Sequence, residues 1–258
     1  MYLPYWLLPI LAAPFIGSFL GVVVRRLPEG RRIATGRSAC DHCGAILGVR
    51  DLVPLASWAW NRGRCRHCGA RLGLFFPAIE LMALLVACAA ASVDVAAGEG
   101  IARLAVDCAL GWILLALAWI DAEHFLLPDV ITLPLLAAGL AVTAWEAPEL
   151  LPDRALGAAI GYVLFRGIAY LYRRWRGREG LGEGDAKLLA AAGAWLGAAA
   201  LAWVILGAAA AGLLGAGVAV LAGRRLDAGT ALPFGACLAL AFFVLRLAGL
   251  AGFDLSPD

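Results

Sequence analysis

The sequence predicts an all-α polytopic membrane protein with about eight transmembrane helices and a small cysteine-rich loop domain in the cytoplasm. Of its 258 residues 63% are hydrophobic and 16% are charged, and the mean hydropathy is +0.85. A soluble domain has about 45–50% apolar residues with glycine included and about 25% charged residues. A water-soluble globular protein is therefore excluded. The net charge of +2 is too small to indicate a nucleic-acid partner.

Apolar runs define the expected membrane spans. One span needs about 20 residues to cross roughly 30 Å of hydrocarbon. Residues 25–76 must lie in water, because they hold 10 of the 21 Lys and Arg residues and four of the seven cysteines. The remaining apolar runs predict spans near residues 4–24, 77–93, 101–120, 129–146, 154–172, 186–198, 199–222 and 231–250.

Basic residues predict the orientation of these spans. Met1 to Val24 contains no Lys or Arg, so we expect a retained first span with its amino end outside. Positive charges then gather in every second loop, which predicts both chain ends outside. The run from Ala191 to Ala200 has no polar break; if 186–222 were one long span, the carboxyl end would lie inside. The basic groups are residues 25–76, then Arg173, Arg174, Arg176 and Arg178, then Arg224 and Arg225.

Four cysteines predict a structural zinc site. Cys40 and Cys43 form one CxxC pair, Cys65 and Cys68 form a second, and 21 residues separate the two pairs. Two such pairs supply the four thiolates of a tetrahedral zinc site. The glycine after each pair, Gly44 or Gly69, suits a turn that needs positive φ. A reducing compartment disfavours the alternative of disulfides or redox pairs. His42 and His67 lie within the two pairs as substitute ligands.

Two carboxylates at the ends of spans form a candidate catalytic pair. Asp121 ends the third predicted span, and Asp185 opens the sixth within Gly182-Glu183-Gly184-Asp185. In the eight-span arrangement both lie at the cytoplasmic side. Two aspartates within about 3 Å of each other can share one proton and hydrolyse a peptide bond. The alternative is that these acids cap helices or form salt bridges.

The ordered motifs resemble the type IV prepilin peptidases, a family of GxGD membrane aspartyl proteases. The resemblance extends over nearly the whole chain. It rests on Asp121 with Pro128-Asp129, on Gly182 to Asp185, and on a series of preceding motifs. These are Gly17-Ser18-Phe19-Leu20, Arg26-Leu27-Pro28, Arg37-Ser38 with Cys40, Asp51-Leu52-Val53-Pro54 with Ser57-Trp58, Gly63-Arg64-Cys65-Arg66 with Cys68, and Pro77 with Glu80.

The resemblance implies two activities in the bacterial inner membrane. Asp121 and Asp185 are the implied catalytic pair. They would cleave the leader of type IV prepilins and type II secretion pseudopilins after a glycine at the cytoplasmic face. The bifunctional members then methylate the new amino terminus with S-adenosylmethionine, and the cysteine loop belongs to this form. The expected division is a first helix over 1–24, the zinc loop over 25–76, and helices two to eight with the protease site over 77–258.

Five further residues are candidate supporting groups, and three of them have a plain structural alternative. Gly182 and Gly184 would let a substrate strand approach. Asp129 supports the site or is the N-cap of the fourth span. Lys187 pairs with Asp185 or Glu183, or extends to the interface. Glu80 binds the new ammonium group or is a charge at a helix start.

Two other functions stay open from the sequence. One is a proton- or ion-coupled transporter with a zinc regulatory loop, which would distribute acids through the membrane depth. Asp107, within the third span, has no obvious partner. The other is a peptidase without methylation, because the family usually has Asn at the position of Gly21 and Arg-Tyr at Phe75-Phe76.

Overall fold

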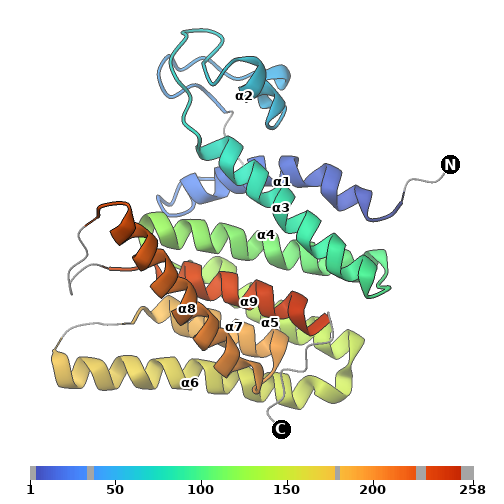
Figure 1. Cartoon of the computed structure of the whole chain (residues 1–258), viewed down its shortest axis with the longest axis vertical. Coiled ribbons are helices and arrows are strands. Elements are labelled where there is room, and N and C mark those ends of the chain that lie inside the picture. The colour runs from blue at the N-terminus through green and yellow to red at the C-terminus, as the bar shows by residue number, and fades with distance from the viewer. Residues whose placement is uncertain (1–3, 34–37, 178–180, 225–230, 251–258) are drawn as a thin grey trace. The chain divides into compact units, whose positions relative to one another are not determined.

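The computed structural model describes residues 4–33, 38–177, 181–224 and 231–250. The basic residues Arg37, Arg178 and Arg225 lie outside this part of the chain. Described residues form helices and two isolated β-bridges, which confirms the all-α class (Figure 1). The helices are α1 (Leu7–Arg26), α2 (Ala56–Trp60), α3 (Phe75–Ala96), α4 (Ile101–His124), α5 (Asp129–Glu146), α6 (Leu151–Arg176), α7 (Glu183–Leu196), α8 (Ala200–Leu221) and α9 (Phe234–Leu250), with 3-10 turns at Val49–Leu52 and Pro148–Leu150.

Six of these helices are long and apolar enough to cross a membrane, so the expected count of about eight is not confirmed. The six are α1, α3, α4, α5, α6 and α8. The other two predicted spans correspond to α7 and α9, of 14 and 17 residues. At 1.5 Å per residue α7 measures about 21 Å, which is less than the roughly 30 Å of hydrocarbon.

Gly197 separates α7 from α8. Its φ of +91° lies in the region that favours glycine, and α7 ends at the residue before it. Residues 186–222 therefore do not form one continuous helix.

The structure divides into two compact units, and the division falls within α4 after Ala116. In the first unit α1 packs along α3 (Figure 1). Small residues allow this approach: a Cβ at Gly17 would lie 2.6 Å from the Glu80 Cα atom. A Cβ at Gly21 would lie 2.8 Å from the Phe76 ring. Gly21 therefore lies against the ring of Phe76. Both positions are among those at which the chain departs from the family that it resembles.

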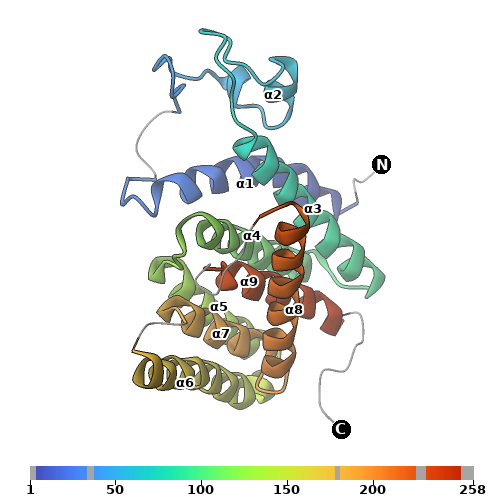
Figure 2. The ribbon, with the colours of Figure 1, turned by 60° about the vertical axis from the view of Figure 1, so that its left-hand side comes forward.

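In the second unit α7 is the central helix. Every residue from Asp185 to Trp195 is buried except Lys187. Helices α5, α6 and α9 pack against it (Figure 2). The contact with α6 brings two backbones together, because a Cβ at Gly161 would lie 2.7 Å from the Leu189 carbonyl oxygen. Small residues thus permit close helix packing here.

Candidate active site and metal centre

The second unit brings Asp121 and Asp185 together. Asp121 lies in the last turn of α4, which ends where Phe125 takes a φ of +52°. Asp185 lies in the first turn of α7. Their exposed fractions are 6% and 8%, and Asp121 is close enough to act electrostatically on Asp185. Two buried carboxyl groups that act on each other electrostatically do not readily both ionise.

The start of α9 adds a group to this site that the sequence analysis missed. The Ala236 N–H donates a hydrogen bond of 2.8 Å to Asp121 Oδ2. The neighbouring Gly235 has no room for a side chain, because a Cβ there would lie 2.9 Å from the Asp121 Cγ atom. The available signal was the Pro233-Phe234-Gly235 sequence at the start of an apolar run. Proline before a helix is common, so this signal alone did not indicate the site.

The glycines before Asp185 have internal partners. A Cβ at Gly184 would lie 2.7 Å from Leu127 Cβ, so the side chain of Leu127 fills the space that we expected for a substrate strand. Gly182 is the N-cap of α7, and the Asp185 carboxylate accepts a hydrogen bond from its backbone. These glycines permit packing around the acid, while the close approach of substrate to them stays a prediction.

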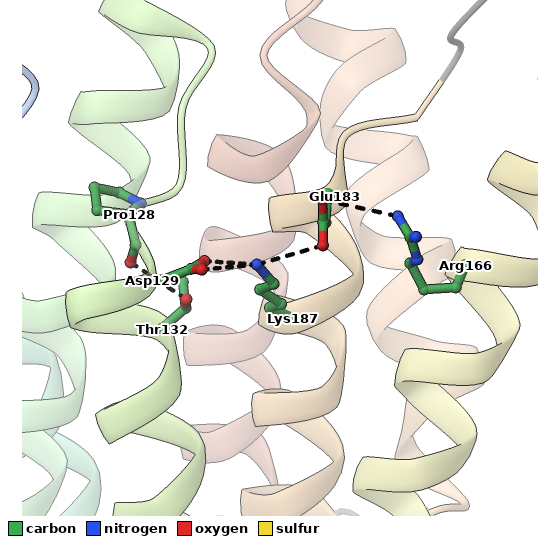
Figure 3. Close-up of polar contacts among 6 residues, drawn as sticks. All are labelled: Pro128, Asp129, Thr132, Arg166, Glu183 and Lys187. Carbon is green, nitrogen blue, oxygen red and sulfur yellow. Dashed lines mark hydrogen bonds and ion pairs between the residues drawn. The ribbon is translucent and has the colours of Figure 1, made fainter.

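Lys187 ties α7 to α5 (Figure 3). Its Nζ atom donates to Asp129 Oδ1 at 2.7 Å and to Oδ2 at 2.9 Å, and lies 3.6 Å from Glu183. The expected pairing with Glu183 is present, but the main partner is Asp129. Asp129 is the first helical residue of α5 and Pro128 is the N-cap, so the N-cap interpretation of Asp129 is wrong.

Glu80 belongs to the first unit and anchors the loop between α1 and α3. Its carboxylate accepts a hydrogen bond of 2.7 Å from the N–H of Leu55, a residue with a φ of +58°. Glu80 is 5% exposed and lies beyond the first turn of α3, so the interpretation as a charge at a helix start is wrong. This geometry does not test the predicted role of Glu80 in binding the new ammonium group of the substrate.

The four cysteines cluster as predicted. All four Sγ atoms lie within 4.8 Å of one another, and Cys40 Sγ is 3.9 Å from Cys68 Sγ. A tetrahedral site with Zn–S distances of about 2.3 Å needs sulfurs about 3.8 Å apart. Each pair lies on a turn closed by a glycine at positive φ, Gly44 at +68° and Gly69 at +72°. The cluster therefore fits a metal ion, and His42 and His67 are exposed and outside it.

Two of the thiols have opposite pKa shifts. The backbone N–H groups of Cys68 and His67 lower the pKa of the Cys65 thiol to about 6. The Ala70 N–H lowers the pKa of Cys68, but burial and the neighbouring sulfurs outweigh it and raise this pKa to about 11. One thiolate thus disfavours the next, which a bound cation would relieve.

Asp107 has a partner, contrary to expectation. Its Oδ2 atom lies 3.2 Å from Arg103 Nε, one helical turn earlier on α4. Asp107 and Asp94 are fully buried. The i,i+4 spacing of Arg103 and Asp107 is visible in the sequence and could have indicated this pair.

The fold and these sites define a class: a helical membrane protein with a buried pair of carboxyl groups and a cluster of four cysteines. A model of the bacterial peptidase A24 N-terminal domain matches residues 11–93, and a model of the type IV leader peptidase family matches residues 108–220. No solved structure matches.

Three curated relatives share the name prepilin leader peptidase/N-methyltransferase. The Aeromonas hydrophila protein is 36% identical in an alignment of 217 positions that covers 75% of this chain and 73% of the relative. The Pseudomonas aeruginosa protein is 36% identical in an alignment of 271 positions, gaps included, that covers 96% of this chain and 91% of the relative. The Burkholderia pseudomallei 1026b protein is 41% identical in an alignment of 207 positions that covers 70% of this chain and 66% of the relative. The chain therefore belongs to the type IV leader peptidase family.

Proposed function

We propose that this chain removes the leaders of type IV prepilins and type II secretion pseudopilins and then methylates the new amino terminus. The observation that carries the peptidase step is the convergence of Asp121 and Asp185 in the second unit. They come from the end of one helix and the start of another, 64 positions later, and both are buried. The name of the relatives, prepilin leader peptidase/N-methyltransferase, supports both the cleavage and the methylation.

Peptide hydrolysis by this pair needs one ionised and one protonated carboxyl group. The ionised group takes a proton from water as the water oxygen bonds to the scissile carbonyl carbon, and the protonated group gives its proton to the carbonyl oxygen. In the second step the C–N bond breaks. The first carboxyl group returns its proton to the leaving nitrogen, while the second takes a proton from a hydroxyl group of the intermediate. The starting protonation is thereby restored.

The methylation step is proposed from the loop and from family membership. The donor would be S-adenosylmethionine, which supplies the methyl group that the new amine accepts. Glu80 and the loop residues that it holds belong to the unit matched by the N-terminal family model. We assign no residue to binding the donor.

Zinc at Cys40, Cys43, Cys65 and Cys68 would be structural, because four sulfurs complete its coordination. The loop around it has few buried apolar side chains, so much of its folding free energy would come from the metal. We retain the proposed division into a first helix over 1–24, a loop over 25–76 and a protease region over 77–258.

The proposed location is the bacterial inner membrane, with the aspartates and the zinc loop toward the cytoplasm. The apolar helices and the relatives support a membrane protein of this kind. The basic residues that end α1 and α6 support the orientation, because Lys and Arg concentrate on the cytoplasmic side. No nucleic acid is a proposed partner.

A cleavage assay tests the peptidase proposal. Purified enzyme in detergent is expected to cleave a prepilin after its glycine, and mass spectrometry of the product reports methylation. Asp121→Asn and Asp185→Asn should each lower kcat by at least about 10³-fold, because removing one member of a catalytic pair removes the shared function. Full cleavage by either variant would refute the assignment. Ion flux through proteoliposomes that is lost in Asp185→Asn would instead support the transporter.

A further inference from the structure

The amino end of α9 contacts Asp121 directly. The Ala236 N–H donates to Asp121 Oδ2 at 2.8 Å, and the Gly235 backbone also makes a hydrogen bond to this carboxylate. Ala236 is the third residue of α9. The first four N–H groups of a helix have no partner within the helix. Asp121, 115 positions earlier in the chain, therefore supplies an acceptor that the start of α9 needs.

The absence of a side chain at Gly235 makes this contact possible. A Cβ there would lie 2.9 Å from Asp121 Cγ and 2.8 Å from Leu127 Cδ1. Real Cβ atoms essentially never approach other heavy atoms so closely. Any other residue would push α9 away from the carboxylate or turn the carboxylate out of position.

The two aspartates have different sets of donors. Among the residues that the structure describes, Asp121 accepts from the backbone of Gly235 and Ala236 at the positive end of α9, whereas Asp185 accepts from the backbone of Gly182. Backbone donors stabilise the charged form of a carboxyl group. In a pair that shares one proton, the negative charge therefore rests preferentially on Asp121.

We propose that the amino end of α9, through Gly235 and Ala236, is a positioning element that keeps Asp121 as the ionised member of the pair. This inference rests on the proposed peptidase function and assigns its two roles. Asp121 takes the proton from the attacking water. Asp185 gives its proton to the carbonyl oxygen of the substrate. Gly235 and Ala236 touch neither water nor substrate and act through Asp121.

The sharpest test replaces the Ala236 N–H by an ester oxygen, through incorporation of lactic acid at position 236 of the full-length enzyme. This change removes one donor and leaves the side chain in place. We expect kcat for prepilin cleavage to fall by about 10- to 100-fold with KM little changed, because preorganised donors act on the reacting groups. The acid limb of the pH–rate profile should move to higher pH, because Asp121 with one donor fewer is protonated at a higher pH.

The pH readout separates this role from a merely structural one. Within the described ranges, the titratable groups placed against Asp121 are Asp185 from α7 and the Cys237 thiol from α9. The alanine variant of Cys237 provides the reference profile for the second group. A structural defect would lower the plateau without moving the acid limb. Movement of the alkaline limb alone would show that Asp121 is the proton donor, and would overturn the assignment.

A conventional variant tests the packing at Gly235. Gly235→Ala should lower kcat by about 100-fold, whereas Gly249→Ala on the same helix should leave activity unchanged, because a Cβ there meets nothing within 4 Å. Adding Leu127→Ala removes one of the two close contacts. Recovery of native kcat in the double variant would overturn the proposal, because the Asp121 contact would then be immaterial.

The native enzyme and the two Asp→Asn variants are measured alongside. If the native enzyme does not cleave, the proposed function itself fails. If it cleaves and both Asp→Asn variants are inactive, but the ester variant has native kcat and a native pH profile, only the role of α9 fails.

Discussion

At the scale of single residues, charge placement near Asp185 depends on Lys187. Its side chain is 17% exposed, and its ammonium group lies between Asp129 and Glu183 (Figure 3). It also lines an apolar groove of about 350 Å³ together with Leu133 and Tyr162. Lys187 is two residues after Asp185, so its ion pair fixes the first turn of α7 against α5.

Lys187→Ala is expected to lower prepilin cleavage by about 10-fold, because the first turn of α7 loses its tie to α5 and Asp185 shifts slightly. The cost in stability should be small, about 0–1 kcal/mol, since the Asp129 side chain is 58% exposed and the pair is partly screened. Kinetics and thermal unfolding in detergent measure both quantities. Arg166→Ala is the matched control, because Arg166 also approaches Glu183, at 4.0 Å, but from α6. Equal losses of prepilin cleavage in Lys187→Ala and Arg166→Ala would show that the Lys187–Asp129 ion pair has no special role.

At the scale of elements, the loop between α1 and α3 is built from two knuckles and a short helix. Each knuckle is closed by one isolated β-bridge, Ala39 with Ile46 and Arg64 with Arg71. The Asp51 carboxylate lies 3.2 Å from the Arg66 guanidinium, which ties the 3-10 turn to the second knuckle. Because these contacts are few, a bound metal ion would contribute strongly to the stability of the loop.

Cys40→Ser or Cys65→Ser should therefore remove the metal, whereas native protein should contain about one zinc ion per chain. The loop should then become sensitive to protease, and methylation of the cleaved product should be lost. Peptide cleavage should persist, because Asp121 and Asp185 belong to the other unit. Metal analysis, limited proteolysis and mass spectrometry report these results. Cys88→Ser is the control, since this exposed thiol lies on α3 outside the cluster. Full zinc content in Cys40→Ser would contradict the four-cysteine site.

At the scale of the whole molecule, the arrangement of the chain in the membrane depends on α7. It is too short to span alone, yet it is surrounded by α5, α6 and α9 and almost wholly buried. A helix shielded by protein need not match the hydrocarbon thickness by itself. The eight-span arrangement therefore predicts that α7 and α8 form two crossings separated at Gly197.

Sandwich fusions of alkaline phosphatase test this arrangement. Insertions at Gly98 and at Ala198 should be active, because both loops are expected outside. An insertion at Arg224 should be inactive, since basic loops stay in the cytoplasm. An active fusion at Arg224 would show that α7 does not cross. Insertion at Gly177, beside the arginines that end α6, is the cytoplasmic control.

The sequence predicted local features well. The helix bounds follow the apolar runs to within a few residues, as for α5 at Asp129–Glu146, because each helix satisfies its own backbone hydrogen bonds. The knuckle glycines have the positive φ that their place after CxxC indicates. The two aspartates were named because acids are costly near hydrocarbon. In each case the physical cause lies within a few residues along the chain.

Only the tertiary structure decided which distant groups meet. The contact of Ala236 with Asp121, the anchoring of Leu55 by Glu80, and the filling of the space at Gly184 by Leu127 all join separate elements. No local pattern marks them, because a backbone N–H is present in nearly every residue and a glycine suits many environments. Hydropathy and spacing therefore predicted the helices and the cysteine cluster and made the two acids candidates, while the resemblance to the prepilin peptidases implied their catalytic role. Packing between helices decided which backbone groups surround those acids, since it depends on close approaches that the chain order does not encode.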